Sequence, residues 1–367
     1  MVLICEGADL YRHELRDTLS KIINGDIKSA EKDIELIEDR LAHTYDKSML
    51  LPIYFVNAIR KRIEGSSWKV PNLYLLNDSN QQMSVFNFMA NQFPLVSYVQ
   101  KIANEAIANV MKGERSVLLL DVGIGTGLQI ERMIQEYYSS NGDLPLIKII
   151  GIEPSIESKN KLLSRVKTLE NRYNINIDLV TILSAVEDLS DQDWLNIRRQ
   201  VLEEEGPLIA NASFSLHHTP LLKRDEVLHN IYNLKPDLFV ITEPDADYLI
   251  DDMLLKYDNA WDHYERVFHV IDQIDVDETN KNMVKTIFFG REIQDVLSTN
   301  SVELYETAFQ WTSRLENIGF SNINTPVVSE GILSEIESSG LCSLVANESH
   351  LTIEVRNKPV VSVMMIA

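Results

Sequence analysis

Residues 116–127 read SVLLLDVGIGTG, and this stretch decides the fold. Its first part is a short apolar run bounded by turn residues, the pattern of a strand buried on both faces of a parallel sheet. Glycines then occupy every second position, at Gly123, Gly125 and Gly127. The next residues share one helical face, which carries Ile130, Met133, Ile134 and Tyr137. Strand, glycine turn and helix in this order predict the entrance to a nucleotide-cofactor site, because glycines let the backbone approach a ligand closely.

The spacing of the glycines distinguishes two classes of cofactor. A dinucleotide fingerprint, G-x-G-x-x-G, would need its third glycine where this chain has Leu128. The chain instead has G-x-G-x-G, and Asp121 stands two residues before the first glycine. That arrangement resembles the first motif of S-adenosylmethionine (SAM) methyltransferases. The resemblance implies that Asp121 faces the amino group of the methionine part; an ordinary tight turn between strand and helix is the alternative.

The composition of the chain excludes several classes of protein. The chain has 367 residues, of which 45% are hydrophobic, and this length allows one elaborated domain or two. Its formal net charge is −21, and an acidic surface repels phosphate backbones, so we expect no nucleic-acid partner. The two cysteines, Cys5 and Cys342, lie far apart and fit a reducing compartment. Because no signal peptide and no apolar stretch of roughly 20 residues is visible, we expect a cytoplasmic protein without a membrane partner.

The rest of the chain reads as helices and strands. Helical stripes cover residues 8–66, a polar loop follows at 77–80, and a helical segment at 84–112 should break at Pro94. After the glycine turn, strands are expected at 146–152, 177–183, 207–213 and 238–242, with helices at 155–172, 191–204 and 224–234 between them. Such alternation implies parallel crossovers and a doubly wound α/β sheet. Residues 246–285 and 286–318 read as further helix, and a turn at 357–359 should join two antiparallel strands.

Polar residues at the ends of strands are the candidate cofactor ligands, because open α/β sheets bind ligands at the carboxyl ends of their strands. Glu153 ends the second strand, where a carboxylate can accept hydrogen bonds from both ribose hydroxyls; a role at the N-terminus of the next helix is the alternative. The third strand ends in Ala185, Val186 and Glu187, at a position that resembles the adenine-binding turn of methyltransferases. Ala185 replaces the polar residue often found there, so Ser184 or Glu187 would have to carry adenine specificity. A solvated loop is the alternative for Glu187.

The fourth strand ends in NASFSLHH, residues 211–218, where the methyl group to be transferred would lie. Asn211 is expected at the cofactor. His217 is a candidate substrate contact and His218 a candidate base, because imidazole titrates near neutrality. A histidine pair hydrogen-bonded into its own loop is the alternative. We expect no metal, since no neighbouring residues have a metal-site spacing such as H-E-x-x-H.

The fifth strand ends in an acidic cluster. Glu243 is a candidate catalytic base, because clustered acids raise one another's pKa. Asp247 and Tyr248 follow it as candidate substrate contacts, and an acidic loop without catalytic role is the alternative. Arg291 is a further candidate for substrate binding, with an internal ion pair to Glu292 as its alternative.

Seven motifs, taken in order, resemble the GRAS family. They are FPLVSYVQKIANEAI (93–107), LLLDVGIGTGLQ (118–129), the Gly151-Ile152 pair, NASFSLHH (211–218), LKPDLFVITEPDADY (234–248), FFGREIQDVL (288–297) with Trp311, Arg314 and Gly319-Phe320 behind it, and the final hairpin. The resemblance implies a Rossmann-type methyltransferase core, residues 91–245 and 286–367, with a helical cap. Residues 1–90 would form the cap, and a helical insertion at 246–285 would join it.

The resemblance also implies an alternative activity. Plant members of the family are transcriptional regulators with a degenerate glycine motif, whereas the intact motif of this chain resembles the bacterial branch. The chain lacks the family's terminal Trp, and Tyr248 stands for its second Asn, so regulatory contacts are not carried over.

Two hypotheses follow. In the first, the chain is a SAM-dependent methyltransferase: Asp121, the three glycines and Glu153 hold the cofactor, and His218 or Glu243 takes the proton. A small-molecule substrate would lie between core and cap. In the second, the chain keeps the fold as a non-catalytic small-molecule receptor or interaction scaffold. A homodimer is compatible with both.

Overall fold

The computed structural model describes residues 3–43, 49–65, 88–89, 92–298, 300–321, 323–325 and 327–366. Its contacts divide the chain into two compact units. The helical unit comprises Met1–Met89 and Ala246–Tyr305, and the sheet unit comprises Ala90–Asp245 and Glu306–Ala367. Each chain unit is therefore described by itself.

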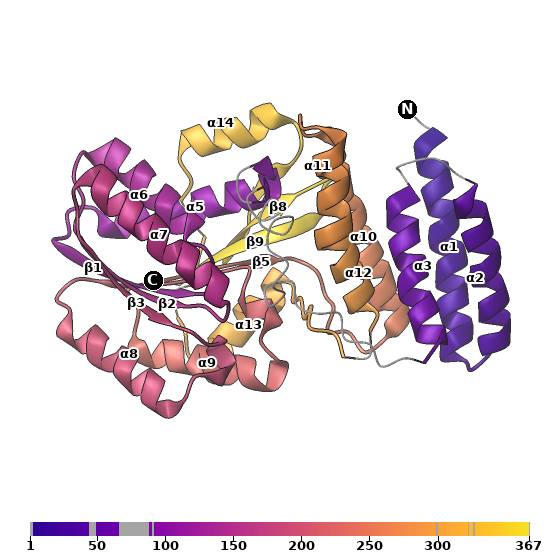
Figure 1. The fold of residues 1–367 in the computed structure, drawn as a ribbon, viewed down its shortest axis with the longest axis horizontal. Coiled ribbons are helices and arrows are strands. Elements are labelled where there is room, and N and C mark those ends of the chain that lie inside the picture. The colour runs from indigo at the N-terminus through magenta and orange to yellow at the C-terminus, as the bar shows by residue number, and fades with distance from the viewer. Residues whose placement is uncertain are drawn as a thin grey trace. The chain divides into compact units, whose positions relative to one another are not determined.

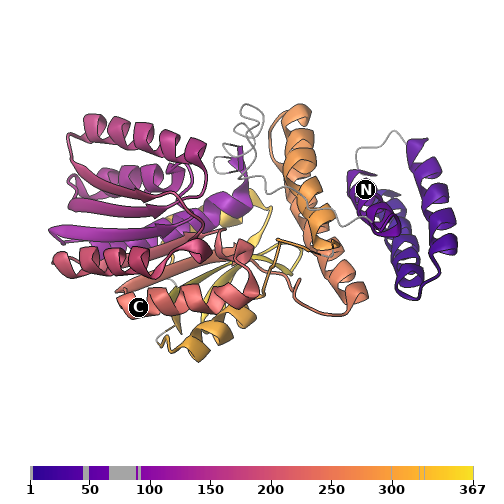
Figure 2. The same cartoon turned by 60° about the horizontal axis from the view of Figure 1, so that its bottom comes forward.

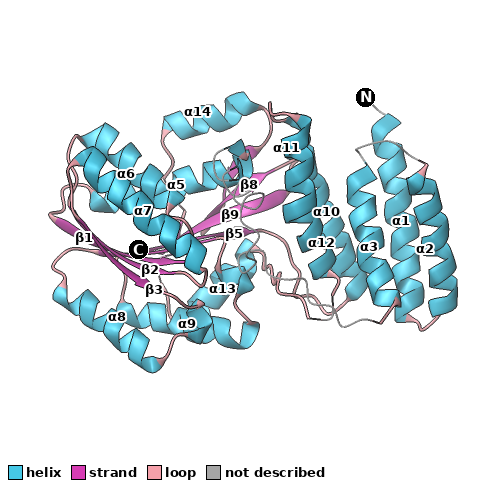
Figure 3. Ribbon diagram, viewed as in Figure 1, coloured by secondary structure: helices cyan, strands magenta, loops and turns pink. Residues whose placement is uncertain are grey.

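Within the described residues, the sheet unit is built on one mixed sheet of nine strands, in the order β3-β2-β1-β4-β5-β9-β8-β7, with β6 also paired to β9. The parallel part consists of β1 (Ser116–Val122), β2 (Leu146–Ile152), β3 (Ile177–Ile182), β4 (Leu208–Ser213) and β5 (Leu238–Pro244). The antiparallel part consists of β6 (Ile323–Asn324), β7 (Ser343–Ala346), β8 (His350–Glu354) and β9 (Pro359–Ile366). Figure 3 shows these strands gathered in a single layer.

Helices cover both faces of this sheet (Figures 1 and 2). One face carries α5 (Pro94–Met111), α6 (Leu128–Asn141) and α7 (Ile156–Tyr173). The other carries α8 (Asp191–Glu203), α9 (Leu221–Leu234) and α13 (Ala308–Ile318), whose apolar residues pack with Leu118, Leu120 and Val122 of β1 in one core. Because successive side chains of a strand point to opposite faces, Asp121 points to the α5–α7 face.

The order 3-2-1-4-5 places the break between β1 and β4, where the chain reverses its direction of travel across the sheet. Ligand sites of open α/β sheets lie at such a break, at the carboxyl ends of the strands. The fold is a Rossmann-type α/β core closed by antiparallel strands, as the sequence predicts. The predicted turn at 357–359 indeed joins β8 to β9.

The helical unit consists of α1 (Leu3–Ile23), α2 (Ile27–Ala42), α3 (Leu50–Ile63), α10 (Met253–Gln273), α11 (Glu278–Met283), a π-helical turn (Val284–Phe289) and α12 (Gly290–Val296). Its core is aromatic: Phe55 of α3 packs against Trp261 of α10 with ring centroids 4.9 Å apart. None of the helices in the described ranges combines the length and the apolar character needed to cross a membrane.

Two expectations change at the end of the helical unit. The sequence predicts that the core resumes at residue 286, whereas the structure has it resume at Glu306. The residues between belong to the helical unit, because α12 packs on α3: a Cβ on Gly290 would lie 2.8 Å from the Tyr54 ring. The helix expected at 286–318 is also interrupted. The buried carboxylate of Asp295 accepts the backbone N–H groups of Val302 (2.7 Å) and Glu303 (2.9 Å), which holds a loop ahead of α13.

The helices expected at 155–172, 191–204 and 224–234 agree with the structure within a few residues, whereas the helix expected at 246–285 begins at Met253 and is interrupted between Gln273 and Glu278. Pro94 begins α5, as its missing N–H and fixed φ favour. The predicted loop at 77–80 lies outside the described residues. The helix α14 (Glu330–Ser339) was not expected from the sequence.

Candidate functional site

The three glycines of the turn all have left-handed backbones, with φ of 76° at Gly123, 57° at Gly125 and 74° at Gly127. Their surroundings differ. A Cβ on Gly123 would lie 2.6 Å from Cβ of Ser215, and one on Gly127 would lie 2.5 Å from Cδ1 of Leu162. A Cβ on Gly125 would meet only the Gly123 carbonyl oxygen, at 3.9 Å. The outer glycines are therefore needed for packing, whereas the middle one faces open space.

Glu153, at the end of β2, is bonded to the glycine turn. Its Oε2 accepts the backbone N–H of Gly125 at 2.9 Å, and its Oε1 accepts the N–H of Ser155 at 2.8 Å. Burial raises the pKa of Glu153, and these two hydrogen bonds oppose the rise. The acid thus joins the turn after β1 to the start of α7, and each of its oxygens has a further lone pair that can accept a hydrogen bond.

Asp121 belongs to a buried polar chain between the sheet and its covering helices. Its register partner on β4 is Asn211, whose amide hydrogen-bonds the Asp121 carboxyl and also donates to Oε1 of Gln129 at 3.4 Å. Gln129, on α6, donates in turn to Oδ1 of Asn104 on α5, at 3.3 Å. Burial raises the pKa of Asp121 to about 7; the neighbouring charge of Glu153 adds to the rise and Asn211 opposes it.

The predicted adenine turn lies at the end of β3. Val186 is buried at the start of a 3-10 turn, Val186–Asp188, and the Ser184 hydroxyl donates to the carbonyl of Ala185 at 2.9 Å. Glu187 is half-buried, and its burial raises its pKa. Ala185 has no polar side chain, so at this position the turn can contact a ligand through its backbone.

Glu243 and His217 form a buried pair at the ends of β5 and β4. Oε2 of Glu243 lies 2.5 Å from Nδ1 of His217, and the two side chains are 1% and 5% exposed. The other oxygen, Oε1, accepts the backbone N–H groups of Ser215 (3.2 Å) and Leu216 (2.8 Å). Glu243 therefore contacts three nitrogen atoms of one loop and fixes the ring of His217 through Nδ1.

His218 packs its ring against that of His217, with centroids 3.9 Å apart. Glu243 thus contacts His217 directly, and His217 contacts His218 through its ring. The sequence predicts Glu243 and His218 as candidate bases, and catalysis by either residue stays a prediction.

Behind this loop lies a fully buried cation. Arg224 of α9 donates from Nη2 to the backbone carbonyls of His217 (2.9 Å) and Thr219 (3.1 Å), and from Nη1 to Oε2 of Glu306 (2.5 Å). Its guanidinium also lies 4.9 Å from the ring centroid of Trp311. The histidine loop is thus fixed from both sides, by Glu243 and by Arg224.

The sequence did not single out Arg224, Gln129 or Asn104. Arg224 stands on the apolar stripe of α9, with Val227, Leu228 and Ile231, and Asn104 stands on the buried face of α5. A polar residue on the apolar face of an amphipathic helix is the signal that could have found them.

The predicted substrate contacts Asp247, Tyr248 and Arg291 belong to the helical unit. Tyr248 is 1% exposed and stacks on Tyr305, with ring centroids 4.7 Å apart. Oδ1 of Asp247 accepts the backbone N–H of Leu249 at 3.0 Å. Local structure thus accounts for Tyr248 and Asp247, and substrate contact by these residues stays a prediction.

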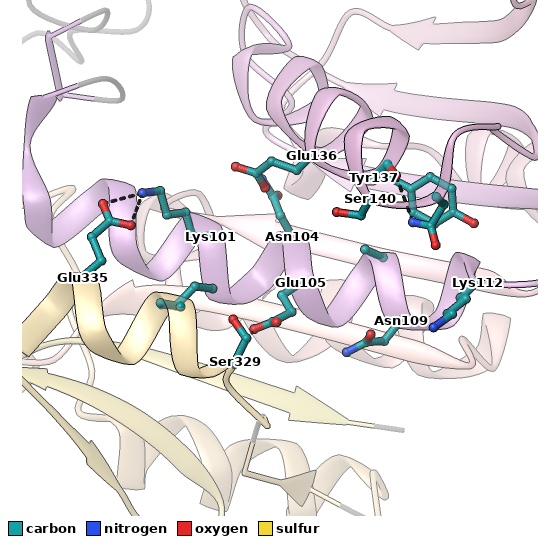
Figure 4. Close-up of a pocket in the computed structure, with 14 residues that line it drawn as sticks. Lys101, Asn104, Glu105, Asn109, Lys112, Glu136, Tyr137, Ser140, Ser329 and Glu335 are labelled. Atoms are coloured by element: carbon teal, nitrogen blue, oxygen red, sulfur yellow. Dashed lines mark hydrogen bonds and ion pairs between the residues drawn. The ribbon is translucent and has the colours of Figure 1, made fainter.

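A polar groove of about 410 Å³ lies elsewhere on the sheet unit, between α5, α6 and α14 (Figure 4). Lys101 on α5 contacts both carboxylate oxygens of Glu335 on α14, at 2.5 and 2.6 Å. The Glu105 carboxylate accepts the N–H of Ser329 at 2.9 Å. These charges join α14 to α5, so we assign the groove a structural role.

Comparison with known proteins identifies relatives of this chain. The GRAS domain family matches residues 11–341. DELLA protein RGL3 of Arabidopsis thaliana is 24% identical over 282 residues, which cover 74% of this chain and 52% of that protein. Scarecrow-like protein 1 of Arabidopsis thaliana is 22% identical over 302 residues, or 75% of this chain and 49% of the relative. The chain thus spans about half the length of these relatives.

A solved structure agrees with the fold. The crystal structure of SCL7 in Oryza sativa superposes with a TM-score of 0.72 at 18% identity, covering 88% of this chain and 90% of the other. At this identity the likeness concerns the fold alone.

Proposed function

The chain belongs to the GRAS domain family, and from this premise we propose that it is a SAM-dependent methyltransferase acting on a small molecule. The observation that carries the proposal is the turn after β1, in which Asp121, Gly123, Gly125 and Gly127 are intact and Glu153 is bonded to Gly125.

The residues around this turn fit the cofactor in two respects. The open space at Gly125 leaves room for a ligand against the backbone, which a side chain would fill. Oδ1 of Asn211 is buried and finds no hydrogen-bond partner within the described part of the chain, beside the Asp121 carboxyl. Two oxygen acceptors side by side suit the ammonium group of an amino acid.

In this proposal Asp121 and Asn211 bind the ammonium group, Glu153 binds the ribose hydroxyls, and the backbone of residues 185–187 borders the adenine. When bound, SAM supplies a methyl group activated by its sulfonium. The protein's contribution is mostly alignment, which can supply several kcal/mol of the barrier, roughly 7–11 in favourable intramolecular cases.

In this proposal the Glu243–His217 pair takes up the proton that the methyl acceptor loses. Nδ1 of His217 is bonded to Glu243, which fixes the orientation of the ring, and an imidazole at this place is suited to take the proton of an acceptor hydroxyl or amine. Glu243 is then a positioning residue, and His218 borders the same place through its ring contact with His217.

A second candidate, a non-catalytic receptor or scaffold, is favoured by one observation. Both oxygens of Glu153 already accept backbone N–H groups, so the acid has a structural task without any ribose. In this case the glycine turn has a structural role alone, connecting neighbouring strands, and relatives with a different sequence at this turn would keep the fold.

Isothermal titration of the whole chain with SAM and with its product S-adenosylhomocysteine (SAH) separates the two candidates. The methyltransferase proposal expects both to bind in the micromolar range, with a Glu153→Gln variant at least tenfold weaker. Absence of heat at millimolar SAM would rule it out and favour the scaffold.

A further inference from the structure

Phe214 has a backbone conformation that bulky residues rarely adopt. Its φ is +54°, and the other described non-glycine residues with positive φ are Asn174, Lys235, Arg356 and Asn357. Asn174 and Lys235 cap the ends of α7 and α9, and the other two lie in the turn between β8 and β9. Those are ordinary places for such a backbone, whereas Phe214 follows a central strand.

Hydrogen bonds on both sides hold Phe214 in this conformation. Its N–H donates to the carbonyl of Thr242 on β5, at 2.8 Å. The next residue, Ser215, donates from Oγ to the carbonyl of Val122 on β1 at 2.7 Å and from its N–H to Glu243 at 3.2 Å. Ser215 also fills the space beside Gly123. Unfavourable backbone angles persist where the surroundings over-determine them, and they gather at functional sites.

The position of Phe214 relative to the candidate site is specific. It directly follows β4, next to the glycine turn through Ser215 and three residues before His217. Its ring is half-buried and so stays outside the apolar core beneath the sheet. The residue before it, Ser213, has a buried hydroxyl without a hydrogen-bond partner among the residues the structure describes. A half-buried aromatic ring therefore stands at the carboxyl end of β4, next to the glycine turn.

We propose that Phe214 is a platform on which the methyl acceptor stacks, and that the acceptor is a planar, conjugated ring with a polar substituent. This inference rests on the proposed function. Aromatic rings attract one another in offset-stacked or edge-to-face arrangements beyond simple burial. A ring stacked on Phe214 would lie at the end of β4, beside the glycine turn and the loop that carries His217. A saturated ring of the same size lacks the π face and gains less from the contact.

Paired probes test the platform directly. Catechol and 2-naphthol are planar, and cyclohexane-1,2-diol and decahydro-2-naphthol are their saturated counterparts. Each is titrated into the whole chain by calorimetry, with and without SAH. The planar probes should bind about tenfold more tightly than the saturated ones. Phe214→Leu, which keeps the apolar bulk and the backbone strain, should remove about fivefold to tenfold of that preference, as the loss of one aromatic pair predicts. Phe214→Trp should retain it.

The outcomes are separable. If planar and saturated probes bind alike, or if Phe214→Leu keeps the preference, the platform is refuted, even where SAH binds well. If SAH fails to bind while the planar preference holds, the platform stands and the proposed function fails. Circular dichroism and SAH titration of Phe214→Leu show whether the fold and the cofactor site are kept, and Phe214→Tyr serves as a second variant should Phe214→Leu fold poorly.

Discussion

Glu243 holds His217 across the ends of two neighbouring strands, with Oε2 2.5 Å from Nδ1, while its other oxygen binds two backbone N–H groups of the same loop. The carboxylate therefore serves three donors of one loop. This explains why the loop after β4 has a fixed shape although it contains neither a long helix nor a strand.

Replacing Glu243 should destabilise the sheet unit. Glu243→Ala removes the partner of two backbone N–H groups and of Nδ1 of His217, so we expect a loss of about 3–5 kcal/mol in the free energy of unfolding. Glu243→Gln keeps an acceptor oxygen and should lose less than half as much. Urea unfolding followed by circular dichroism measures both. A loss below about 1 kcal/mol for Glu243→Ala would mean that the loop is held by other contacts.

The middle and the last glycine of the turn should respond differently to substitution. Both have positive φ, so an alanine costs about 1–3 kcal/mol at either position. At Gly127 the added Cβ also meets Leu162 at 2.5 Å, which overpacks the core by about 1–3 kcal/mol more. We therefore expect Gly127→Ala to be the less stable variant by urea unfolding.

For ligand binding the order of the two positions reverses. Gly125→Val fills the open space at the turn and should abolish SAM binding in calorimetry while the fold survives. Gly127→Ala should retain measurable binding wherever it is folded. Undiminished SAM affinity of Gly125→Val would show that the cofactor binds elsewhere.

The sequence predicts the parallel sheet, its closing hairpin and the glycine turn well, because each depends on local patterns: apolar runs, glycine spacing and a turn at 357–359. It also places Asp121, Glu153 and Glu243 at strand ends, where the structure has them. What it cannot predict is pairing between distant residues. The contact of Glu153 with Gly125 joins residues 28 positions apart, and that of Arg224 with Glu306 joins residues 82 apart. For the same reason the sequence cannot predict that the returning core segment starts at Glu306. The helical pattern of α12 does not show which of the two units the helix packs in.

The pKa of Asp121 gives the stability a dependence on pH. Its folded pKa, raised by burial to about 7, lies above the ordinary value of 3.8, so the folded state binds the proton more tightly. This contribution is fully present below pH 3.8 and is lost as the pH rises to about 7. Asp121→Asn should remove it and be the more stable protein at pH 8, by about 2–4 kcal/mol. Urea unfolding at pH 5 and pH 8 checks this; equal differences at both values would contradict it.

Cofactor binding should show the opposite trend with pH. The ammonium group of SAM is attracted by the ionised form of Asp121, so its affinity should rise as the pH increases toward 7 and level off above. Because each unit of pH below the pKa reduces the ionised fraction about tenfold, the affinity at pH 6 should be several-fold lower than at pH 8. Calorimetry at both pH values measures the ratio. An Asp121→Asn variant should bind weakly and without this pH dependence.

Arg224 offers the sharpest test of how the histidine loop is held. Arg224→Met leaves the carbonyls of His217 and Thr219 without their donor, and it leaves Glu306 with Arg314, which bonds it from Nη2 at 2.5 Å. Breaking a buried ion pair from one side usually costs about 3–5 kcal/mol, and we expect that loss in urea unfolding. Arg199→Met on the exposed side of α8 is the matched control, with an expected change within about 0.5 kcal/mol.

The double variant Arg224→Met with Glu306→Gln separates the ion pair from the loop contacts. If the ion pair dominates, the double variant is hardly less stable than Arg224→Met, because Arg224→Met alone has already broken the pair between Arg224 and Glu306. If the bonds to the two carbonyls dominate, the losses add. The histidine loop distinguishes the cases further: the imidazole signals of His217 in nuclear magnetic resonance should shift in both variants that lack Arg224 and stay unchanged in Glu306→Gln alone. A shift of equal size in Glu306→Gln would mean that the loop is positioned by the whole charge network and not by the guanidinium itself.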